Sequence, residues 1–208
     1  METYQAIANR KTIRDFNNQE LDPELVRRIV AAGMEAPSNN HMREWHFVIL
    51  QDKARRCELL DQVIKPVSKK GALGIINRWK LTDEFQREMY LDAIPKQYSM
   101  LVNAGCLILP FYFQYTPLLK PKTLSDLNSF ASIWCCIENM LVAAASEGIF
   151  GVTRIPSESE GKMIRQFLNV PEGYEMPCYL ALGDPGEDAK SAKQVEIILK
   201  EKIHIDTW

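Results

Sequence analysis

The sequence predicts a sandwich of helices and strands, of the α/β or α+β class. Strand-like runs alternate with helical segments along the chain, and no internal repeat or low-complexity stretch interrupts the alternation. The 208 residues are 46% apolar and 25% charged, which is an ordinary globular composition for a chain able to bury one core. We therefore expect residues 1–208 to form a single domain.

The N-terminal part of the chain contains two helix signals. Residues 2–9 are expected to form a short helix with Tyr4, Ile7 and Ala8 on one face. Asp22 and Pro23 mark the start of a second helix, because a carboxylate caps free N–H groups and a proline at the first position needs no partner. We expect that helix to stop before Pro37.

A strand follows, and then a region where the pattern weakens. Residues 46–50 are rich in β-forming side chains and end near Asp52, which predicts a capped helix reaching about residue 64. Residues 65–70 are basic, contain a proline and precede two glycines, so we expect this region to be variable or mobile. Helix signals return at Asp83, with a glutamine three residues later.

The clearest element of the sequence is a long apolar helix over residues 127–148. A stripe spaced by three and four residues runs along it, and most positions beside the stripe are also apolar. The strand expected just before it, residues 107–115, contains Pro110, which favours an edge, a bulge or an irregular end. We expect about 22 residues of helix, buried on nearly all sides, and infer that a second copy of the chain covers part of it.

The C-terminal third predicts one more helix and one more strand. Ser157 and Glu160 have capping-box spacing, with Met163 among the side chains expected to face inward. A turn at 171–173 leads to a strand over residues 176–182. The tail from Val195 to Trp208 mixes apolar and charged residues, so we expect it to pack against something.

Charge and cysteine content exclude several classes of protein. A net charge of −2 supplies no cationic field for general nucleic-acid binding. The chain begins without an apolar leader and holds no uncharged apolar run of about 18 residues, so we expect a cytoplasmic protein that does not enter membranes. Five cysteines without a CxxC pair, and three scattered histidines, predict buried thiols and no metal site.

A basic stretch near the N-terminus is the first candidate for chemistry. Arg10, Lys11, Thr12 and Arg14 lie within the sequence RKTIRDF, and alternation in an extended segment would turn the first, third and fifth side chains to one face. Guanidinium groups with a hydroxyl supply the converging donors that a phosphate needs. A solvated basic face is the alternative interpretation.

Two further motifs make the pattern specific. The sequence APSNNHMREWHFVIL follows the second helix, and VPEGYEMPCYLALGDP follows the capping-box helix. Together with RKTIRDF, in this order and over this length, they resemble the nitroreductase family of FMN-dependent oxidoreductases. The resemblance implies an α+β fold, a three-layer α/β/α sandwich with a mainly antiparallel sheet and a long central helix at a homodimer interface.

The resemblance also implies a cofactor site. Arg10, Lys11 and Thr12 would hold the phosphate and ribityl chain of FMN, and Arg14 would reach the pyrimidine edge of the flavin, where a fixed guanidinium favours the reduced form. The other residues that it implies around the flavin are Pro37, Ser38, Asn39 and His41, the segment Thr153, Arg154 and Ile155, and Lys190 or Lys193 as a further phosphate ligand. A segment over about 65–100 would form a substrate lid, or its aromatic side chains would serve ordinary packing.

The chain departs from the family pattern at one loop. His41, Arg43 and Glu44 stand where the family usually has asparagine, glutamine and proline. An imidazole still donates a hydrogen bond, but Arg43 adds a charge that glutamine lacks, so substrate preference stays open.

The implied activity is transfer of a hydride from NADH or NADPH to FMN, then reduction of a nitroaromatic, a quinone or a similar small acceptor. The alternatives are a flavin-binding sensor or carrier without turnover, and a specialised flavoenzyme of the same fold, including a dehalogenase. The Ser/His/Asp and Cys/His sets of hydrolases and the glycine-rich loop of dinucleotide-binding dehydrogenases are absent at useful spacing. No side chain is assigned as a catalytic acid or base.

Overall fold

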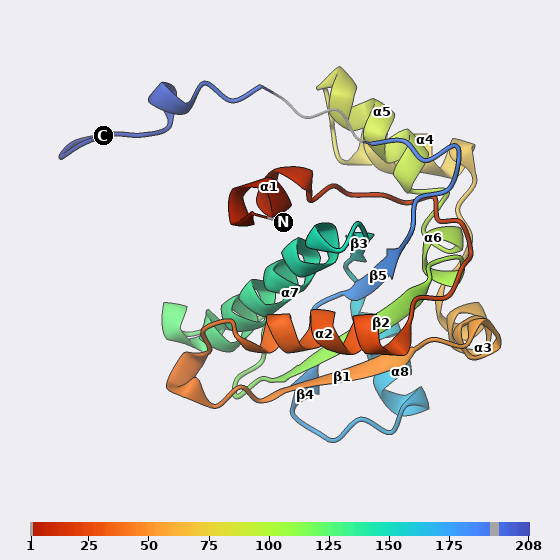
Figure 1. Cartoon of the computed structure of the whole chain (residues 1–208), viewed down its shortest axis with the longest axis horizontal. Helices are drawn as coiled ribbons and strands as arrows, with labels where there is room; N and C mark the ends of the chain where they lie inside the picture. The colour runs from red at the N-terminus through yellow and green to blue at the C-terminus, as the bar shows by residue number, and fades with distance from the viewer. Residues whose placement is uncertain (1, 192–195) are drawn as a thin grey trace.

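A computed structural model gives an antiparallel sheet between two layers of helices (Figure 1). It describes residues 2–191 and 196–208. In these residues the sheet follows the order β1-β2-β5-β3, with β4 paired to the far end of β2, and all of these pairings are antiparallel. The strands are β1 Trp45–Leu50, β2 Cys106–Phe113, β3 Phe150–Arg154, β4 Tyr174–Glu175 and β5 Tyr179–Gly183.

The helices divide between the two faces of this sheet. Helices α2 Pro23–Met34 and α7 Asn128–Ser146 pack on one face, and α1 Thr3–Asn9 packs on α7. Those on or beyond the other are α3 Lys53–Val63, α4 Lys69–Arg78, α5 Glu84–Ala93, α6 Ser99–Val102 and α8 Glu158–Phe167. Short 3₁₀ turns complete the described elements: η1 Asn39–His41, η2 Leu124–Leu127 and η3 Leu199–Glu201.

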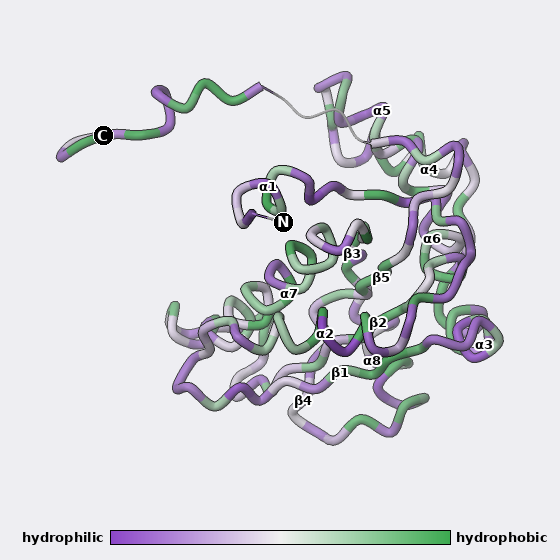
Figure 2. Tube along the Cα trace, in the orientation of Figure 1, coloured by the Kyte–Doolittle hydropathy of each residue, from purple (hydrophilic) through white to green (hydrophobic). Residues whose placement is uncertain are grey.

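Alternation along β2 and β5 separates the two cores. Leu107 and Leu109 of β2 pack with α3, α6 and α8, whereas Cys106 and Ile108 pack with α2 and α7. Successive side chains of a strand point to opposite faces, so one apolar run fills both cores. Figure 2 shows this hydrophobic run along the middle of the sheet. The expected α+β three-layer arrangement is confirmed.

The predicted helix starts are confirmed by their caps. The side chain of Asp22 accepts from the N–H of Glu24 over 3.1 Å, at the start of α2. Asp52 and Asp83 cap α3 and α5 in the same way. At α8, Ser157 and Glu160 form the reciprocal capping box, so local sequence alone sets these boundaries.

Two local predictions need correction. Residues 69–78, where the pattern weakens, form α4 through both glycines, because Ser68 caps the helix and Ala72 and Ile76 are fully buried. Of the three options for Pro110, only the edge strand is wrong, because β2 is interior and Pro110 lies opposite Phe47. On the other side of β2 the pairing with β5 covers 106–108 and that with β4 begins at Tyr112, so the proline falls between them.

The long helix is shorter and more open than predicted. It has 19 residues, and Phe130 and Trp134 are only partly buried, while Cys135 is exposed. Cys57 is also partly exposed, so only three of the five thiols are buried as expected. By length and composition the stretch Leu124–Ser146 would suit a membrane span, a test that the central helix of a folded core also passes.

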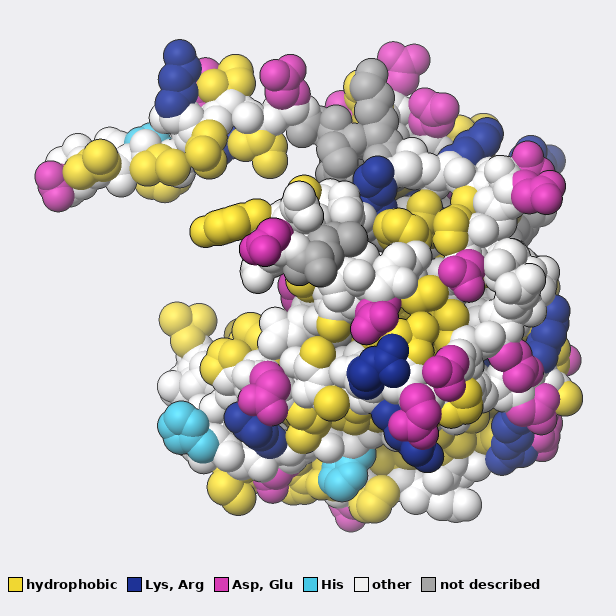
Figure 3. All heavy atoms as spheres, viewed as in Figure 1, with side chains coloured by type: hydrophobic (Ala, Val, Ile, Leu, Met, Phe, Trp, Pro, Cys, Tyr) yellow, Lys and Arg dark blue, Asp and Glu magenta, His cyan; other side chains and the backbone are white. Residues whose placement is uncertain are grey.

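Three further expectations about packing are wrong for the single chain. Tyr4 and Ile7 of α1 are 87% and 51% exposed, and Met163 of α8 is 41% exposed. The tail over 196–208 projects from the body and packs on none of the described cores (Figures 1 and 3). Its exposed apolar side chains are Ile197, Ile198, Leu199, Ile203, Ile205 and Trp208. Helix α1 and this tail therefore leave apolar surface uncovered.

Candidate cofactor site

The basic N-terminal segment lies against the edge strand β3. Thr12 pairs with Gly151 in a parallel bridge, and the N–H of Ile13 donates to the Gly151 carbonyl over 3.3 Å. The outer edge of β3 is thereby extended by the segment after α1. This arrangement brings the predicted residues at 10–14 close to the predicted segment at 153–155, although the two motifs are far apart in sequence.

Arg14 is the most buried cation of this segment. Burial lowers the pKa of its guanidinium, whereas the nearby Asp92, Tyr90 and Asp15 act in the opposite direction. Within residues 2–191 and 196–208, Arg14 has no hydrogen-bond or ion-pair acceptor. A half-buried guanidinium without a contacting acceptor favours an anionic or carbonyl-bearing ligand at this place.

The neighbours of Arg14 in the segment are less buried. Arg10 forms an ion pair with Glu138 of α7, with Nε to Oε1 at 3.1 Å. Lys11 is exposed and Thr12 is partly buried. The three side chains thus lie at the surface above the end of α1, as ligands for a phosphate would.

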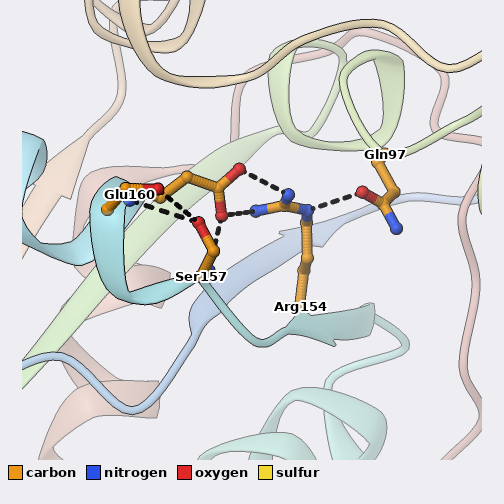
Figure 4. Close-up of polar contacts among 5 residues, drawn as sticks. Gln97, Arg154, Ser157 and Glu160 are labelled. Atoms are coloured by element: carbon orange, nitrogen blue, oxygen red, sulfur yellow. Dashed lines mark hydrogen bonds and ion pairs between the residues drawn. The ribbon is translucent and has the colours of Figure 1, made fainter.

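In the segment at 153–155, the side chain of Arg154 is held by contacts within the chain. Arg154 makes a two-pronged ion pair with Glu160, at 3.1 and 2.8 Å, and donates from Nε to Gln97 at 3.2 Å (Figure 4). Its guanidinium also lies over the ring of Tyr179. The side chains of the ion pair are only 12% and 13% exposed. The side chain of Arg154 therefore makes its contacts within the chain, whereas Ile155 next to it is exposed.

The second predicted group lies around η1. The N–H of Asn39 donates to Ser132 Oγ of α7 over 3.0 Å, which fixes the loop after Pro37 and Ser38 to that helix. His41 is exposed and has a left-handed backbone, with φ of 56°. A cavity of about 20 Å³ opens behind this loop and is lined in part by Tyr112, whose hydroxyl is buried and has no partner among the described residues.

The two groups do not meet within one chain. Residues 10–14 follow α1 beside β3, whereas η1 lies near the start of α7, in a different part of the view in Figure 1. Both groups contact the same helix, through Glu138 and Ser132 respectively. One chain thus presents two separate half-sites along α7.

Of the two lysines predicted as C-terminal phosphate ligands, the structure describes only Lys190. The turn that leads to Lys190 runs beside the basic segment, because the N–H of Gly186 donates to the Asp15 carbonyl over 2.9 Å. The N–H of Asn17 likewise donates to the Asp184 carbonyl. Lys190 itself is exposed, and Lys193 lies outside the described residues.

Sequence reasoning missed several charged residues beside Arg14. Lys96 Nζ lies 2.7 Å from Asp15 Oδ2 and 2.7 Å from Asp92 Oδ1. Burial alone would lower the pKa of Lys96, but its hydrogen bonds with both carboxylates raise it. The i, i+4 spacing of Asp92 and Lys96 is a signal that could have found this pair.

The chemistry of these donors fits a flavin mononucleotide. Cations and a hydroxyl at 10–12 suit a phosphate, and the half-buried Arg14 suits the edge of a flavin that becomes negative on reduction. The segment at 153–155 would add backbone amide and carbonyl groups for the ring.

Comparisons with known proteins identify the family. The model of the nitroreductase family matches residues 7–184. An iodotyrosine deiodinase from Nematostella vectensis is 25% identical over 191 residues, covering 91% of this chain and 69% of the relative. A crystal structure of iodotyrosine deiodinase bound to FMN and 3-iodo-L-tyrosine superposes with a TM-score of 0.73, at 18% identity and full coverage of both chains. An FMN- and NADPH-dependent nitroreductase, NfnB, gives 0.69 at 13% identity, again over both chains.

The fold and the matched span define a protein of the nitroreductase fold. The chain belongs to the nitroreductase family, since the family model covers most of its length. The resemblance expected from the three sequence motifs is thereby confirmed.

Proposed function

We propose that this protein is an FMN-dependent oxidoreductase. The observation that carries the proposal is Arg14, a half-buried guanidinium without an acceptor among the residues that the structure describes, held beside the sheet edge by the pairing of Thr12 with Gly151. Membership of the nitroreductase family and the FMN named in two structures of the same fold support the choice of cofactor.

Each residue of the first half-site has a role in this proposal. Arg10, Lys11 and Thr12 bind the phosphate and ribityl chain, with Lys190 as a further ligand. Arg14 stabilises negative charge on the pyrimidine edge of the reduced flavin. The backbone at 153–155 orients the ring edge at which hydride is exchanged.

The second half-site requires a second copy of the chain. We propose a homodimer in which Pro37, Ser38, Asn39 and His41 of one protomer complete the site formed by residues 10–14 of its partner. Three features support this arrangement: the two half-sites lie apart in one chain, α7 has an open apolar face, and the C-terminal tail is unpacked. Obligate dimers typically bury apolar surface of this kind between their subunits.

FMN, when bound, supplies the transfer of a hydride from NADH or NADPH and its delivery to an acceptor such as a nitroaromatic or a quinone. The protein holds the cofactor, sets its potential and keeps water from the reacting edge. No side chain of the described site needs to act as an acid or base. We further propose that helices α4 and α5 form the predicted lid, because Tyr90 and Asp92 of α5 are close enough to Arg14 to act on its charge and α4 packs on α5.

The test is a visible spectrum of the purified protein after incubation with FMN and removal of the excess. We expect one flavin per chain, and its visible absorbance should bleach when NADH or NADPH is added without oxygen. A protein that retains FMN but is not bleached by NADH or NADPH would be the flavin-binding sensor or carrier instead. A preparation that retains no flavin would contradict the proposal.

A specialised flavoenzyme is the second candidate, favoured by the deiodinase relative and the deiodinase structure. In that case the flavin would be reduced by another donor and would return two electrons and a proton to a carbon–halogen bond, releasing halide. Chemical reduction of the bound flavin, followed by 3-iodo-L-tyrosine or a nitroaromatic, separates the two. The acceptor that reoxidises the flavin in stoichiometric amount identifies the activity.

A further inference from the structure

A bridge of three charged residues lies beside Arg14. Lys96 Nζ contacts Asp15 Oδ2 and Asp92 Oδ1, each at 2.7 Å. All three side chains are partly buried, with exposed fractions of 26% for Lys96, 33% for Asp15 and 42% for Asp92. Screening by water is therefore incomplete, and these charges act on their neighbours over several ångströms.

The bridge joins two parts of the molecule. Asp15 directly follows Arg14 in the basic segment, whereas Asp92 belongs to α5 and Lys96 follows that helix. Helices α4 and α5 pack on each other around a small cluster of their own, formed by Ala72, Ile76 and Ile94. Lys96 thus ties this helical hairpin to the segment that carries Arg14.

The bridge also balances charge around Arg14. Asp15 and Asp92, the two carboxylates that Lys96 contacts, are also close enough to Arg14 to act on its charge. A guanidinium next to carboxylates attracts a further negative charge less strongly than an isolated one. Without Lys96, both carboxylates would be free to form ion pairs with Arg14.

We propose that Lys96, Asp15 and Asp92 set how strongly Arg14 favours reduced FMN, with Lys96 acting as a positioning residue that occupies both carboxylates. This inference rests on the proposed function, since it concerns the potential of the bound flavin. It extends that function by making the placement of α5 a determinant of the potential.

Charge balance predicts shifts of opposite sign from two substitutions. Asp92→Asn removes a negative charge near Arg14, so the flavin should become easier to reduce. Lys96→Met removes a positive charge and frees two carboxylates to pair with Arg14, so the flavin should become harder to reduce. A purely structural role would weaken the site in both variants and shift them the same way.

The experiment is a redox titration of FMN-loaded wild type and of both variants against a reference dye. We expect the ratio of reduced to oxidised flavin at fixed potential to rise about tenfold in Asp92→Asn and to fall about tenfold in Lys96→Met. For a two-electron couple each change is about 30 mV. Both shifts should shrink in 1 M salt, where screening is stronger.

Matched variants control for folding and for general charge. Asp92→Glu and Lys96→Arg keep the charges and should titrate like wild type. Glu172→Gln and Lys120→Met are the controls for general charge, because they change the charge at exposed positions on other parts of the chain. Asp15→Asn should match Asp92→Asn, and it replaces that variant if Asp92→Asn does not fold.

Shifts of the same sign, or no shift in variants that retain FMN, would overturn the inference. A wild-type protein that binds no FMN would instead contradict the proposed function.

Discussion

Thr12 and Gly151 are parallel neighbours at the outer edge of β3, and the next residue, Ile13, donates its N–H to the Gly151 carbonyl. This pairing joins the basic motif near the N-terminus to the segment that follows the long helix. It explains how two motifs that are remote in sequence contribute to one half-site. The pairing holds the backbone just before Arg14, and the bond from the Gly186 N–H to the Asp15 carbonyl holds it just after.

Replacing Arg14 by alanine should make the bound flavin harder to reduce. The guanidinium stabilises the reduced form through a charge-assisted hydrogen bond, so its loss should cost on the order of 2 kcal/mol, or about 40 mV for two electrons. A potentiometric titration measures the shift, and Arg14→Lys, which keeps the charge, should lose less. An unchanged midpoint potential would remove Arg14 from this role.

Replacing Arg10 by alanine should weaken the binding of FMN more than it changes turnover by flavin already bound. One lost phosphate contact should raise the dissociation constant roughly tenfold, or ~1.4 kcal/mol. Glu138→Gln is the matched control, because it breaks the ion pair with Arg10 and keeps the guanidinium. Equal flavin occupancy of Arg10→Ala and wild type after dialysis would argue against a phosphate contact.

Breaking the Arg154 to Glu160 ion pair should destabilise the fold. Both side chains are nearly buried, so Arg154→Met leaves a carboxylate without its cation and should lower the free energy of unfolding by about 3 kcal/mol. Urea denaturation measures the loss. The double variant with Glu160→Gln should recover part of it, and a loss equal to the sum of the single variants would show that the pair does not interact.

Thiol labelling should distinguish the five cysteines. Burial raises the pKa of Cys106 and of Cys136 to about 12, and it also raises the pKa of Cys178, so these thiols stay protonated and unreactive at pH 7 to 9. Cys135, exposed on α7, should react first. Its labelling rate should fall as protein concentration rises if a second copy covers α7, and a concentration-independent rate would argue against that interface.

Two defective variants should complement each other if the site spans two chains. Arg14→Glu disables the first half-site and Ser38→Trp the second, so neither variant alone should retain FMN. After exchange of subunits, about a quarter of all sites should be intact, since half of the dimers are mixed and each holds one complete site. Failure to recover flavin in mixed dimers verified by mass spectrometry would contradict the two-chain site.

Much of the fold could be predicted because its signals are local. The caps of α2, α3, α5 and α8 depend on one or two side chains within the first turn, as at Asp22 and Ser157. The missed helix α4 contains two glycines, and its burial of Ala72 and Ile76 depends on contacts with α5. Packing of this kind produces no repeat of apolar residues in the sequence that is long enough to recognise.

The candidate site could be predicted only in part. The motif at 10–14 and the segment at 153–155 lie together as expected, but the use of the Arg154 side chain by Glu160 and Gln97 depends on three separate elements. The bridge through Lys96 likewise joins residues that are distant in sequence. Such contacts follow from the topology of the chain rather than from any local pattern.

The most direct test of the account is equilibrium binding of FMN, followed by the flavin absorbance of the protein after gel filtration. We predict one flavin per chain, eluting with a dimer, and a lower occupancy in Arg10→Ala. A wild-type protein that elutes colourless after incubation with excess FMN would contradict the central claim that these half-sites form a flavin site.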